Sequence, residues 1–490
     1  MINPNIFREY DIRGIAEKDL TDETTARVAR AFADVVRGRG GRRVILGHDV
    51  RESPPRLDAV WAREMAGRGL SVVRLGTVPT PVLYYGVILL EGDAGIMITG
   101  SHNPIEYNGF KLQIGRDSLH GEGIADLARR CAAELPGAPG GSAEGKIRET
   151  ARDGEGKAGR EGASPQAAPA IAGRDLDIRD EDIGERYLAM VVERTAPVRP
   201  LKIVIDAGNG TAGPVAGPIL ERLGHHVIPM YCEPDGRFPN HQPDPTVPEY
   251  MRDLQARVVA ERADLGVGYD GDSDRIGVVD ETGRLVYGDQ LLALFARDAL
   301  QRRPGATIVF DVKCSRGLPE DIRAHGGVPL MWRTGHSLTK AKMKEENAPV
   351  AGELSGHMFF KDGFFGHDDA IYASARFAAM LARWGRPLSA VLATLPRYIN
   401  TPEIRVDCSD DAKFRVVREA AAVFARDHEV LTLDGARVEF EDGWGLVRAS
   451  NTQPVLVLRF EARTEEGIRA IEAAFRSVLS AYSEVRWPAS

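Results

Sequence analysis

The sequence has 490 residues, with 63 Lys and Arg against 71 Asp and Glu, and a formal net charge of −8. This length exceeds what one hydrophobic core normally serves, so we expect several domains. The mild negative charge argues against non-specific nucleic-acid binding and against a basic membrane-surface role. The most apolar stretch, residues 81–90, is too short to cross a bilayer, and the N-terminus lacks a signal pattern. We therefore expect a cytoplasmic protein without nucleic-acid or membrane partners.

A strand–helix–strand unit recurs three times, at residues 42–76, 201–231 and 306–335. Each copy joins an apolar β-branched run, a polar or Gly-rich turn, an amphipathic helix and a second apolar strand. This order is typical of βαβ units with parallel strand pairs. From about Arg397 onwards, helices alternate with short strands, as in an α+β domain with an antiparallel sheet. The sequence therefore predicts an α/β protein, with three related α/β domains on mixed sheets and a C-terminal α+β domain.

The regular pattern fails between Pro136 and Arg174, where Gly, Ala and charged residues replace almost all large apolar ones. Such a composition is typical of a flexible linker or insertion. The predicted domain boundaries are residues 1–137, 177–284, 285–396 and 397–490, with the linker at 138–176.

The first chemically distinctive loop follows the apolar strand of GIMITGSHNP and contains Ser101 and His102. Strand ends are where α/β proteins hold ligands and reacting groups. A Gly-x-Ser-x-Gly elbow would need glycine where Thr99 and Asn103 stand, so the α/β-hydrolase interpretation loses its main support. An extended chain would point His102 away from Ser101, so no Ser–His dyad is assumed.

The residues just downstream, YNGFK, contain the dipeptide Asn108-Gly109, which predicts a hairpin turn. Such a turn would fold Lys111 back towards Ser101. A plain surface turn remains an equally good interpretation of this stretch alone.

The second loop, GYDGDSDRIG, repeats a carboxylate at Asp270, Asp272 and Asp274. Three carboxylates this close repel one another unless a cation lies among them, and oxygen ligands favour Mg²⁺. An EF-hand is excluded because Arg275 stands at its required glycine and strands flank the loop. Arg275 adds a fixed positive group suited to an anionic oxygen.

The third loop, AGELSGHMFF, alternates Glu353, Ser355 and His357. If the segment is extended, all three side chains share one side and can bind neighbouring hydroxyls of a sugar. An ordinary polar loop remains an alternative. Lys313 and His336, in loops of the same domain, are two further polar candidates.

The fourth loop, VRASNTQP, forms a turn between two strands. Its forked Arg donor, hydroxyls and backbone amides suit a phosphate dianion, although a plain hairpin turn is the alternative. The residues concerned are Arg448, Ser450, Asn451 and Thr452. A hydroxyl nucleophile, a hard-metal site, a hydroxyl-binding loop and a phosphate turn together indicate phosphoryl transfer on a sugar phosphate, in a central cleft where four domains meet.

These motifs resemble the α-D-phosphohexomutase superfamily, and most closely its bacterial phosphomannomutase/phosphoglucomutase group. The resemblance covers nearly the whole chain, in order, through FREYDIRG, TGSHNP, DGDSDR, DVKCSRG, TGHSLTK, GELSGHMFF and RASNTQP. Two departures stand out: Ser273 replaces a glycine common in this group, which we expect to be harmless, and the 138–176 linker is longer than the family connector.

The resemblance implies a role for each candidate residue. Ser101 would be carried as a phosphoserine, and one of its oxygens would join Asp270, Asp272 and Asp274 around Mg²⁺. Sugar hydroxyls would be bound by Glu353 and Ser355, with His357 close by, and the distal phosphate by Arg448, Ser450, Asn451 and Thr452. The positions matching those near substrate or phosphoserine are Tyr10, Arg13, Lys111, Arg275, Lys313 and His336. We count Ser101, His102, Lys111, Arg13 and Arg275 as the catalytic group.

The implied reaction interconverts hexose 1-phosphate and hexose 6-phosphate, of mannose, glucose or both, through a hexose 1,6-bisphosphate. Glucose 1,6-bisphosphate is the expected activator and a monomer the expected state. The general acid or base stays open among Lys111, His102 and Arg13. Three alternatives are a phosphoglucosamine mutase, a Mg²⁺-dependent sugar phosphatase and a catalytically silent sugar-phosphate-binding protein.

Overall fold

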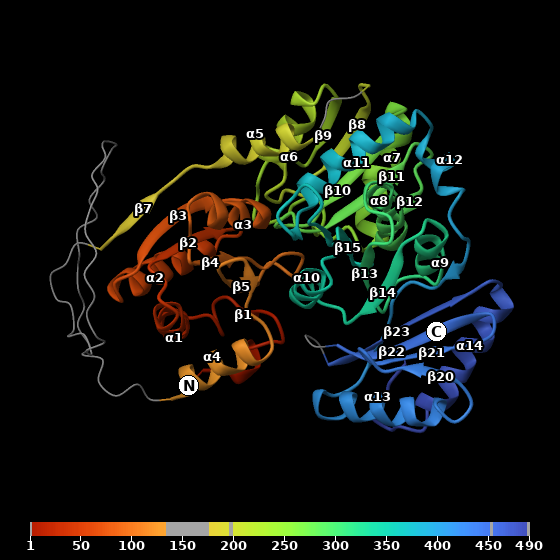
Figure 1. Ribbon diagram of the computed structural model, residues 1–490. Helices are drawn as coiled ribbons and strands as arrows, with labels where there is room; N and C mark the ends of the chain where they lie inside the picture. Colours follow the sequence, from red (N-terminus) through yellow and green to blue (C-terminus); the bar gives the residue numbers. More distant parts are fainter. Residues whose placement is uncertain (1, 134–175, 196–198, 451–453, 488–490) are drawn as a thin grey trace.

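The computed structural model describes residues 2–133, 176–195, 199–450 and 454–487, which form four sheets with their helices (Figure 1). Three sheets mix parallel and antiparallel pairs, and the fourth is antiparallel throughout, which confirms the predicted class. In Figure 1 the four sheets follow one another in chain order around an arc. The predicted linker lies outside the described residues, apart from Leu176.

The first sheet has the strand order β1-β5-β4-β2-β3-β7, with β6 beside β5. Its centre is built from apolar runs that are buried along nearly their whole length, as a parallel sheet covered on both faces requires. The strands are β1 (Ile12–Ile15), β2 (Arg43–His48), β3 (Ser71–Thr77), β4 (Ala94–Ile98), β5 (Tyr107–Ile114), β6 (Asp117–Ser118) and β7 (Ile178–Asp180). The helices are η1 (Pro4–Ile6), α1 (Asp22–Gly38), α2 (Pro54–Gly67), α3 (Thr80–Leu89) and α4 (Glu122–Ala132).

The second sheet has the order β12-β11-β10-β8-β9. Its strands are β8 (Lys202–Asp206), β9 (His226–Met230), β10 (Leu265–Tyr269), β11 (Ile276–Asp280) and β12 (Leu285–Val286). Its helices are α5 (Gly184–Arg194), α6 (Gly213–Arg222), η2 (Pro248–Met251) and α7 (Arg252–Glu261). Near the predicted boundaries, β7 pairs with β3 of the first sheet, and β12 pairs with β11 of the second sheet.

The third sheet has the order β14-β13-β15-β16-β17. Its strands are β13 (Thr307–Asp311), β14 (Val328–Trp332), β15 (Val350–Gly352), β16 (Met358–Phe360) and β17 (His367–Asp368). Its helices are α8 (Gly288–Arg302), α9 (Gly317–Ala324), α10 (His336–Glu345), α11 (Ala370–Trp384) and α12 (Leu388–Leu392).

The fourth sheet has the order β18-β23-β22-β21-β20, with β19 also beside β23. Its strands are β18 (Ile399–Asn400), β19 (Ile404–Asp407), β20 (Glu429–Leu431), β21 (Ala436–Glu439), β22 (Gly443–Ala449) and β23 (Val455–Ala462). Its helices are α13 (Asp410–Phe424) and α14 (Glu465–Leu479). They pack against the sheet and form with it a separate hydrophobic core.

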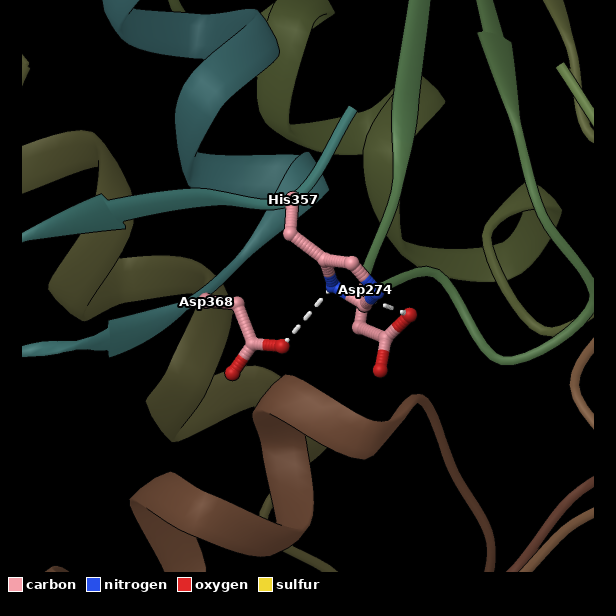
Figure 2. A group of neighbouring side chains, drawn as sticks. All are labelled: Asp274, His357 and Asp368. Carbon is pink, nitrogen blue, oxygen red and sulfur yellow. Dashed lines mark ion pairs between the residues drawn. The ribbon is translucent and has the colours of Figure 1, made fainter. Parts of the chain in front are cut away.

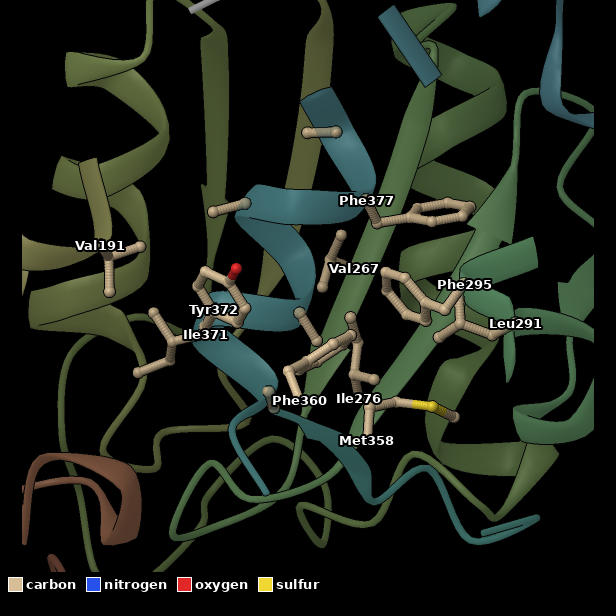
Figure 3. Packing of buried hydrophobic residues seen from close by; sticks show 14 of the residues in the cluster. Val191, Val267, Ile276, Leu291, Phe295, Met358, Phe360, Ile371, Tyr372 and Phe377 are labelled. Atoms are coloured by element: carbon tan, nitrogen blue, oxygen red, sulfur yellow. The ribbon is translucent and has the colours of Figure 1, made fainter. Parts of the chain in front are cut away.

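One large apolar core joins the second and third sheets with part of the first. Helix α11 runs through it and is buried from Ala370 to Ala382, as expected for a helix that is apolar nearly all round. Figure 3 shows Phe377 of this helix near Val267 of β10 and Phe295 of α8. This shared core fixes the second and third domains against each other, so loops from both can build one site. Among the described residues, no helix is long and apolar enough to cross a membrane.

Candidate active site

A cleft of about 690 Å³ opens where residues from all four sheets meet. Most of the side chains that the sequence singles out line it. They are Tyr10, Arg13, Ser101, His102, Lys111, Asp274, Arg275, Lys313, His336, Glu353, Ser355, His357 and Arg448. Asp270 and Asp272 lie fully buried directly beneath Ser101 and Lys111.

Ser101 follows β4 in a turn with left-handed backbone, at φ 47°. Its Oγ donates to Asp270 Oδ2 at 2.7 Å and lies 3.1 Å from His102 Nδ1. The expectation that His102 points away is wrong, because it assumed an extended chain and the left-handed turn brings the ring back. Desolvation, with Arg275 and Arg13, lowers the pKa of His102 well below its usual range. The serine and histidine side chains are therefore adjacent at the foot of the cleft.

A buried ion pair, which the sequence interpretation missed, holds this turn from below. Arg51 Nη2 donates to Ser101 O at 2.8 Å and Asn103 O at 2.7 Å, and its Nη1 donates to Pro104 O at 2.8 Å. Asp49, 3.3 Å from Arg51 Nε, accepts from Gly100 N at 2.9 Å. Both residues follow β2 directly, and a polar pair at the end of a parallel strand was the signal that could have revealed them.

The aspartate loop connects β10 and β11. Asp270, Asp272 and Asp274 are 0% exposed, and ligand atoms from the three lie within 4.8 Å of one another. Burial and the two neighbouring carboxylates raise the pKa of Asp270 well above its usual range. Oδ1 of Asp272 and of Asp274 accepts no hydrogen bond from the described residues. Crowded, buried, unpaired carboxylate oxygens are the donor set of a hard divalent cation, so the residues fit a metal site.

Lys111 reaches this loop from β5. Its Nζ donates to Asp272 Oδ2 at 2.6 Å and also contacts Asp274 Oδ2. Burial would lower the pKa of Lys111, but these carboxylates outweigh it and raise the pKa well above its usual range. The hairpin predicted at Asn108-Gly109 is wrong, because both residues lie inside β5 and pair with β1. A Cβ at Gly109 would lie 2.4 Å from Ile12 O, so glycine serves the close approach of β1 instead of a turn.

The serine turn and the aspartate loop touch through their backbones. A Cβ at Gly271 would lie 2.6 Å from Ser101 O, and only glycine permits this approach. Thr80, at the start of α3, donates from Oγ1 to Asp272 Oδ2 at 2.6 Å and from its backbone N to Asp272 O at 2.8 Å. The first and second domains are thereby joined at Ser101.

The loop with Glu353 and Ser355 turns between β15 and β16. Glu353 N donates to His357 O at 2.9 Å, so the segment is a tight turn and the predicted extended conformation is wrong. Glu353 accepts from Thr339 Oγ1 at 2.9 Å, from Gly335 N at 3.1 Å and from Ser355 Oγ at 3.2 Å. These three hydrogen bonds fix the position of the Glu353 carboxylate. The loop that carries it lines the cleft.

The fourth domain adds positive charge to the cleft. Arg448, on β22, lies 3.1 Å from Asp434 Oδ2, and Ser450 is buried at the end of that strand. Asn451 and Thr452 lie outside the described residues. Lys313 Nζ donates to Glu403 Oε1 at 3.0 Å across the third and fourth domains. Arg405 and Arg459, which the sequence interpretation missed, also line the cleft.

The remaining predicted residues lie between these groups. The ring of Tyr10 packs edge-on against His336, with centroids 5.7 Å apart, at the start of α10. Arg13 Nη2 donates to Asp11 Oδ2 at 2.6 Å. Arg275 Nε donates to His357 Nε2 at 2.9 Å. A hydroxyl beside a metal site, flanked by cations at both ends of a cleft, can transfer a phosphoryl group to a bound anion.

Four models of one protein family match most of the chain. They are the phosphoglucomutase/phosphomannomutase alpha/beta/alpha domains I, II and III, at residues 4–119, 185–283 and 287–398, and the C-terminal domain of the same family, at 403–478.

Individual relatives agree with these models. A phosphomannomutase/phosphoglucomutase of Pseudomonas aeruginosa is 45% identical over 97% of this chain and 96% of its own. A phosphoglucomutase of Neisseria gonorrhoeae is 42% identical over 99% of each chain. A crystal structure of a phosphoglucomutase/phosphomannomutase family protein from Burkholderia thailandensis superposes with a TM-score of 0.84, at 40% identity over 98% of each chain.

Proposed function

Because this chain belongs to the phosphoglucomutase/phosphomannomutase family and is a hexose phosphate mutase, we propose that it interconverts the 1- and 6-phosphates of both mannose and glucose through a phosphoserine at Ser101. The observation that carries this proposal is the contact of Ser101 with Asp270, one of the three clustered buried aspartates, inside a cleft lined by cations from all four domains. Relatives named for both sugars or for glucose alone support the substrate range.

The reaction begins when a hydroxyl of the bound hexose phosphate attacks the phosphorus on Ser101. The bond from phosphorus to the serine oxygen breaks, a bond to the sugar oxygen forms, and the hydroxyl proton passes to a base. Lys111, His102 and Arg13 line the cleft near the serine and are the candidates for the general acid or base. His102 suits the base, because burial lowers its pKa well below the usual range, whereas the raised pKa of Lys111 suits the acid. The resulting 1,6-bisphosphate then returns its other phosphoryl group to Ser101, and Arg448 holds whichever phosphate is distal.

Asp270, Asp272 and Asp274 would hold one Mg²⁺, with an oxygen of the phosphoserine as a further ligand. When bound, the ion offsets the negative charge that develops on the transferring group. Glu353 and Ser355 would bind hydroxyls of the sugar. The space around the sugar would be lined by Lys313, His336 and Tyr10. We include glucose 1,6-bisphosphate as the activator and a cytoplasmic monomer as the working form in this proposal.

A coupled mutase assay tests the proposal. Glucose 1-phosphate, mannose 1-phosphate and glucosamine 1-phosphate are compared at equal concentration, with Mg²⁺ and a trace of glucose 1,6-bisphosphate. We expect comparable rates on glucose and mannose, and a loss of several orders of magnitude in Ser101→Ala. Ser374→Ala is the matched control, because it removes a buried hydroxyl that contacts Tyr269 instead of the aspartates.

Three outcomes would contradict the proposal. Turnover of glucosamine 1-phosphate alone would indicate a phosphoglucosamine mutase, and release of free phosphate without an isomer would indicate a phosphatase. Full activity of Ser101→Ala would remove the phosphoserine. Chelation of divalent metal should abolish the wild-type rate, and Asp272→Asn should not recover it when Mg²⁺ is restored.

A further inference from the structure

Ser273 separates the second and third aspartates of the loop between β10 and β11, at a position where glycine is common in the family. Its side chain is fully buried and its backbone is left-handed, at φ 65°. A left-handed backbone is unfavourable for a residue with a Cβ, and such a residue keeps it only where neighbouring contacts impose it. Whether serine is harmless at this position therefore depends on what its hydroxyl contacts.

Ser273 has a hydroxyl partner in the turn between β8 and α6. Thr211, which is 3% exposed, places its Oγ1 2.8 Å from Ser273 Oγ. Thr211 Oγ1 also donates to Gly271 O at 3.2 Å. Because a hydroxyl group has a single hydrogen to donate and that of Thr211 goes to the carbonyl, Ser273 is the donor between the two hydroxyls. A chain of two hydrogen bonds therefore runs from Ser273 through Thr211 to Gly271 O, and we call it the hydroxyl chain.

The hydroxyl chain reaches both residues that separate the three aspartates of the loop. Gly271 stands between the first and second aspartates, and Ser273 between the second and third. Thr211 also donates from its backbone N to Gly271 O at 3.1 Å, and a Cβ at Gly210 would lie 2.7 Å from the same oxygen. The turn before α6 is thus in direct contact with the loop, so the spacing of the carboxylates depends on this turn.

Other contacts of the loop use the carboxylates themselves. Lys111 donates to Asp272. Figure 2 shows Asp274 beside the ring of His357, and Asp274 Oδ1 lies 3.6 Å from His357 Nδ1. A bound cation requires carboxylate oxygens and competes with such contacts, whereas the hydroxyl chain uses no carboxylate oxygen. The hydroxyl chain can therefore restrain the loop in the same way with and without a cation.

A purely structural role for the Ser273 hydroxyl is the competing explanation. However, the backbone of Ser273 is already held on both sides: its N donates to Asp270 O at 3.0 Å, and its O accepts from Ala370 N at 3.3 Å. These two hydrogen bonds close the loop and connect it to the start of α11. The hydroxyl chain adds a further restraint between two candidate metal ligands, and this restraint limits how far their carboxylates can separate.

We propose that Ser273 and Thr211 are positioning residues that hold the three aspartates at the spacing that suits Mg²⁺ and thereby disfavour the larger Ca²⁺. This inference rests on the proposed function and deepens it. Mg²⁺ requires ligand distances of about 2.0–2.1 Å in near-octahedral geometry, whereas Ca²⁺ accepts about 2.3–2.6 Å and a flexible geometry. A restrained loop keeps the carboxylates close together, and a loop without the hydroxyl chain can widen around the larger ion.

The first test measures the Kd of Mg²⁺ and of Ca²⁺ by titration calorimetry on the wild type, Ser273→Ala and Thr211→Val. We expect the Kd of Mg²⁺ to rise about tenfold in each variant, as when a hydrogen bond behind a metal ligand is lost, and that of Ca²⁺ to change less than threefold. The samples are matched for phosphorylation by intact mass, because a phosphoserine oxygen is a proposed ligand. An unchanged Mg²⁺ affinity, or equal weakening of both ions, would overturn the proposal.

Ser273→Gly separates the hydroxyl chain from backbone strain. Glycine adopts the left-handed conformation freely, so this variant should keep the melting temperature of the wild type. It lacks the hydroxyl, so it should lose the preference for Mg²⁺ as Ser273→Ala does. Wild-type selectivity in Ser273→Gly would reject the role of the hydroxyl. Since metal affinity is measured without turnover, the expected selectivity in a protein without mutase activity would contradict only the proposed function.

The second test is a double-mutant cycle on the ratio of the two Kd values. In the Thr211→Val background, Ser273→Ala should change this ratio less than twofold, because the serine has already lost its acceptor. Full additivity of the two single changes would show that the two hydroxyls act separately and would overturn the proposal.

Ser374→Ala is the matched control. Tyr269 Oη donates to Ser374 Oγ at 2.8 Å, and Ser374 Oγ donates to Ile371 O at 2.8 Å, so this buried serine belongs to a similar chain that does not contact the aspartate loop. The variant should lower the melting temperature and leave both metal affinities unchanged. A tenfold loss of Mg²⁺ affinity in this control would show that any buried hydroxyl has the same effect, and the specific role of Ser273 and Thr211 would be rejected.

Discussion

A single guanidinium group, that of Arg51, fixes the conformation of the turn that contains Ser101. Arg51 is 3% exposed and donates to the carbonyl oxygens of Ser101, Asn103 and Pro104. Those three carbonyls point inward because the chain reverses at Ser101 with φ 47°, a conformation that non-glycine residues adopt only when surrounding contacts impose it. The planar fork of an arginine can reach three acceptors at fixed angles, which an ammonium group cannot.

We predict that Arg51→Lys lowers kcat by about 100-fold, because the charge is kept while the serine turn loses its alignment. Carbonyls left without donors should also reduce the free energy of unfolding by about 1–3 kcal/mol. Steady-state kinetics and thermal melts measure the two effects. Arg376→Lys is the control, since Arg376 is a buried arginine that pairs with Asp298 and Asp362 away from the cleft. Unchanged kcat in Arg51→Lys would refute the alignment role.

At the scale of elements, the long buried helix α11 depends on its N-cap. Asp369 accepts from Tyr372 N at 2.7 Å, and both of its oxygens accept from Tyr187 Oη, at 2.7 and 2.9 Å. Burial raises the pKa of Asp369 to about 7, against 3.8 ordinarily. The folded protein therefore binds a proton here more tightly than the unfolded chain does. The stability tied to this proton is fully present below pH 4 and is lost as the pH rises through 7.

We predict that Asp369→Asn makes the free energy of unfolding less dependent on pH. Asparagine stays neutral, so the variant and the wild type should melt at similar temperatures at pH 4, where the wild-type carboxyl keeps its proton in the folded protein. At pH 8 the variant should melt at a higher temperature than the wild type, because only the wild type then carries a buried charge. The pKa difference corresponds to a change on the order of 4 kcal/mol in the relative free energies of unfolding. Melting curves of both proteins between pH 4 and 8 measure this change. If the two melting temperatures shift in parallel with pH, the raised pKa of Asp369 is refuted.

At the scale of the whole molecule, the fourth domain is attached to the third mainly through polar contacts. Arg437 Nη1 donates to Val312 O at 2.7 Å and Cys314 O at 2.8 Å, and its guanidinium lies 3.8 Å from the centre of the Trp444 ring. A small apolar cluster of Val312, Trp444 and Leu446 completes the junction. Since Arg448 projects from the same sheet into the cleft, this junction sets the position of Arg448, to which the proposed function assigns the distal phosphate.

We predict that Arg437→Met raises KM for hexose phosphates by about tenfold, with a smaller effect on kcat. The variant loses both carbonyl contacts across the junction, so the fourth domain should also melt at a lower temperature than the rest of the chain. Kinetics and calorimetry measure the two effects. Arg415→Met, which breaks contacts with Glu419 and Glu484 within the fourth domain only, should leave KM unchanged. A KM increase of the same size in that control would argue against a role of the Arg437 contacts in substrate binding.

Local sequence patterns failed where partners come from distant segments. Asn108-Gly109 has the composition of a hairpin turn, yet it lies in β5 because β1 pairs along it. The alternation of Glu353, Ser355 and His357 has the period of a strand, yet the segment turns to meet Arg275 of the second sheet. In both cases pairing with a remote strand outweighed the local propensity. Asp49 and Arg51 form a pair only two residues apart, but their role was missed because the backbone groups that they hold, Gly100 N and Ser101 O, lie 51 and 50 residues away and are brought to them by the assembled sheet.

The sequence by itself determined the class of the fold, since the strand–helix–strand order repeats with clear periodicity. It also predicted the chemistry of the site, since a hydroxyl, carboxylates and candidate phosphate-binding groups stand in compact loops. The tertiary structure alone decided which of these groups meet. Ser101 and Asp270 are 169 residues apart in sequence and 2.7 Å apart in space. Contacts of that range depend on how four sheets stack around shared cores, and no local period in the chain encodes them.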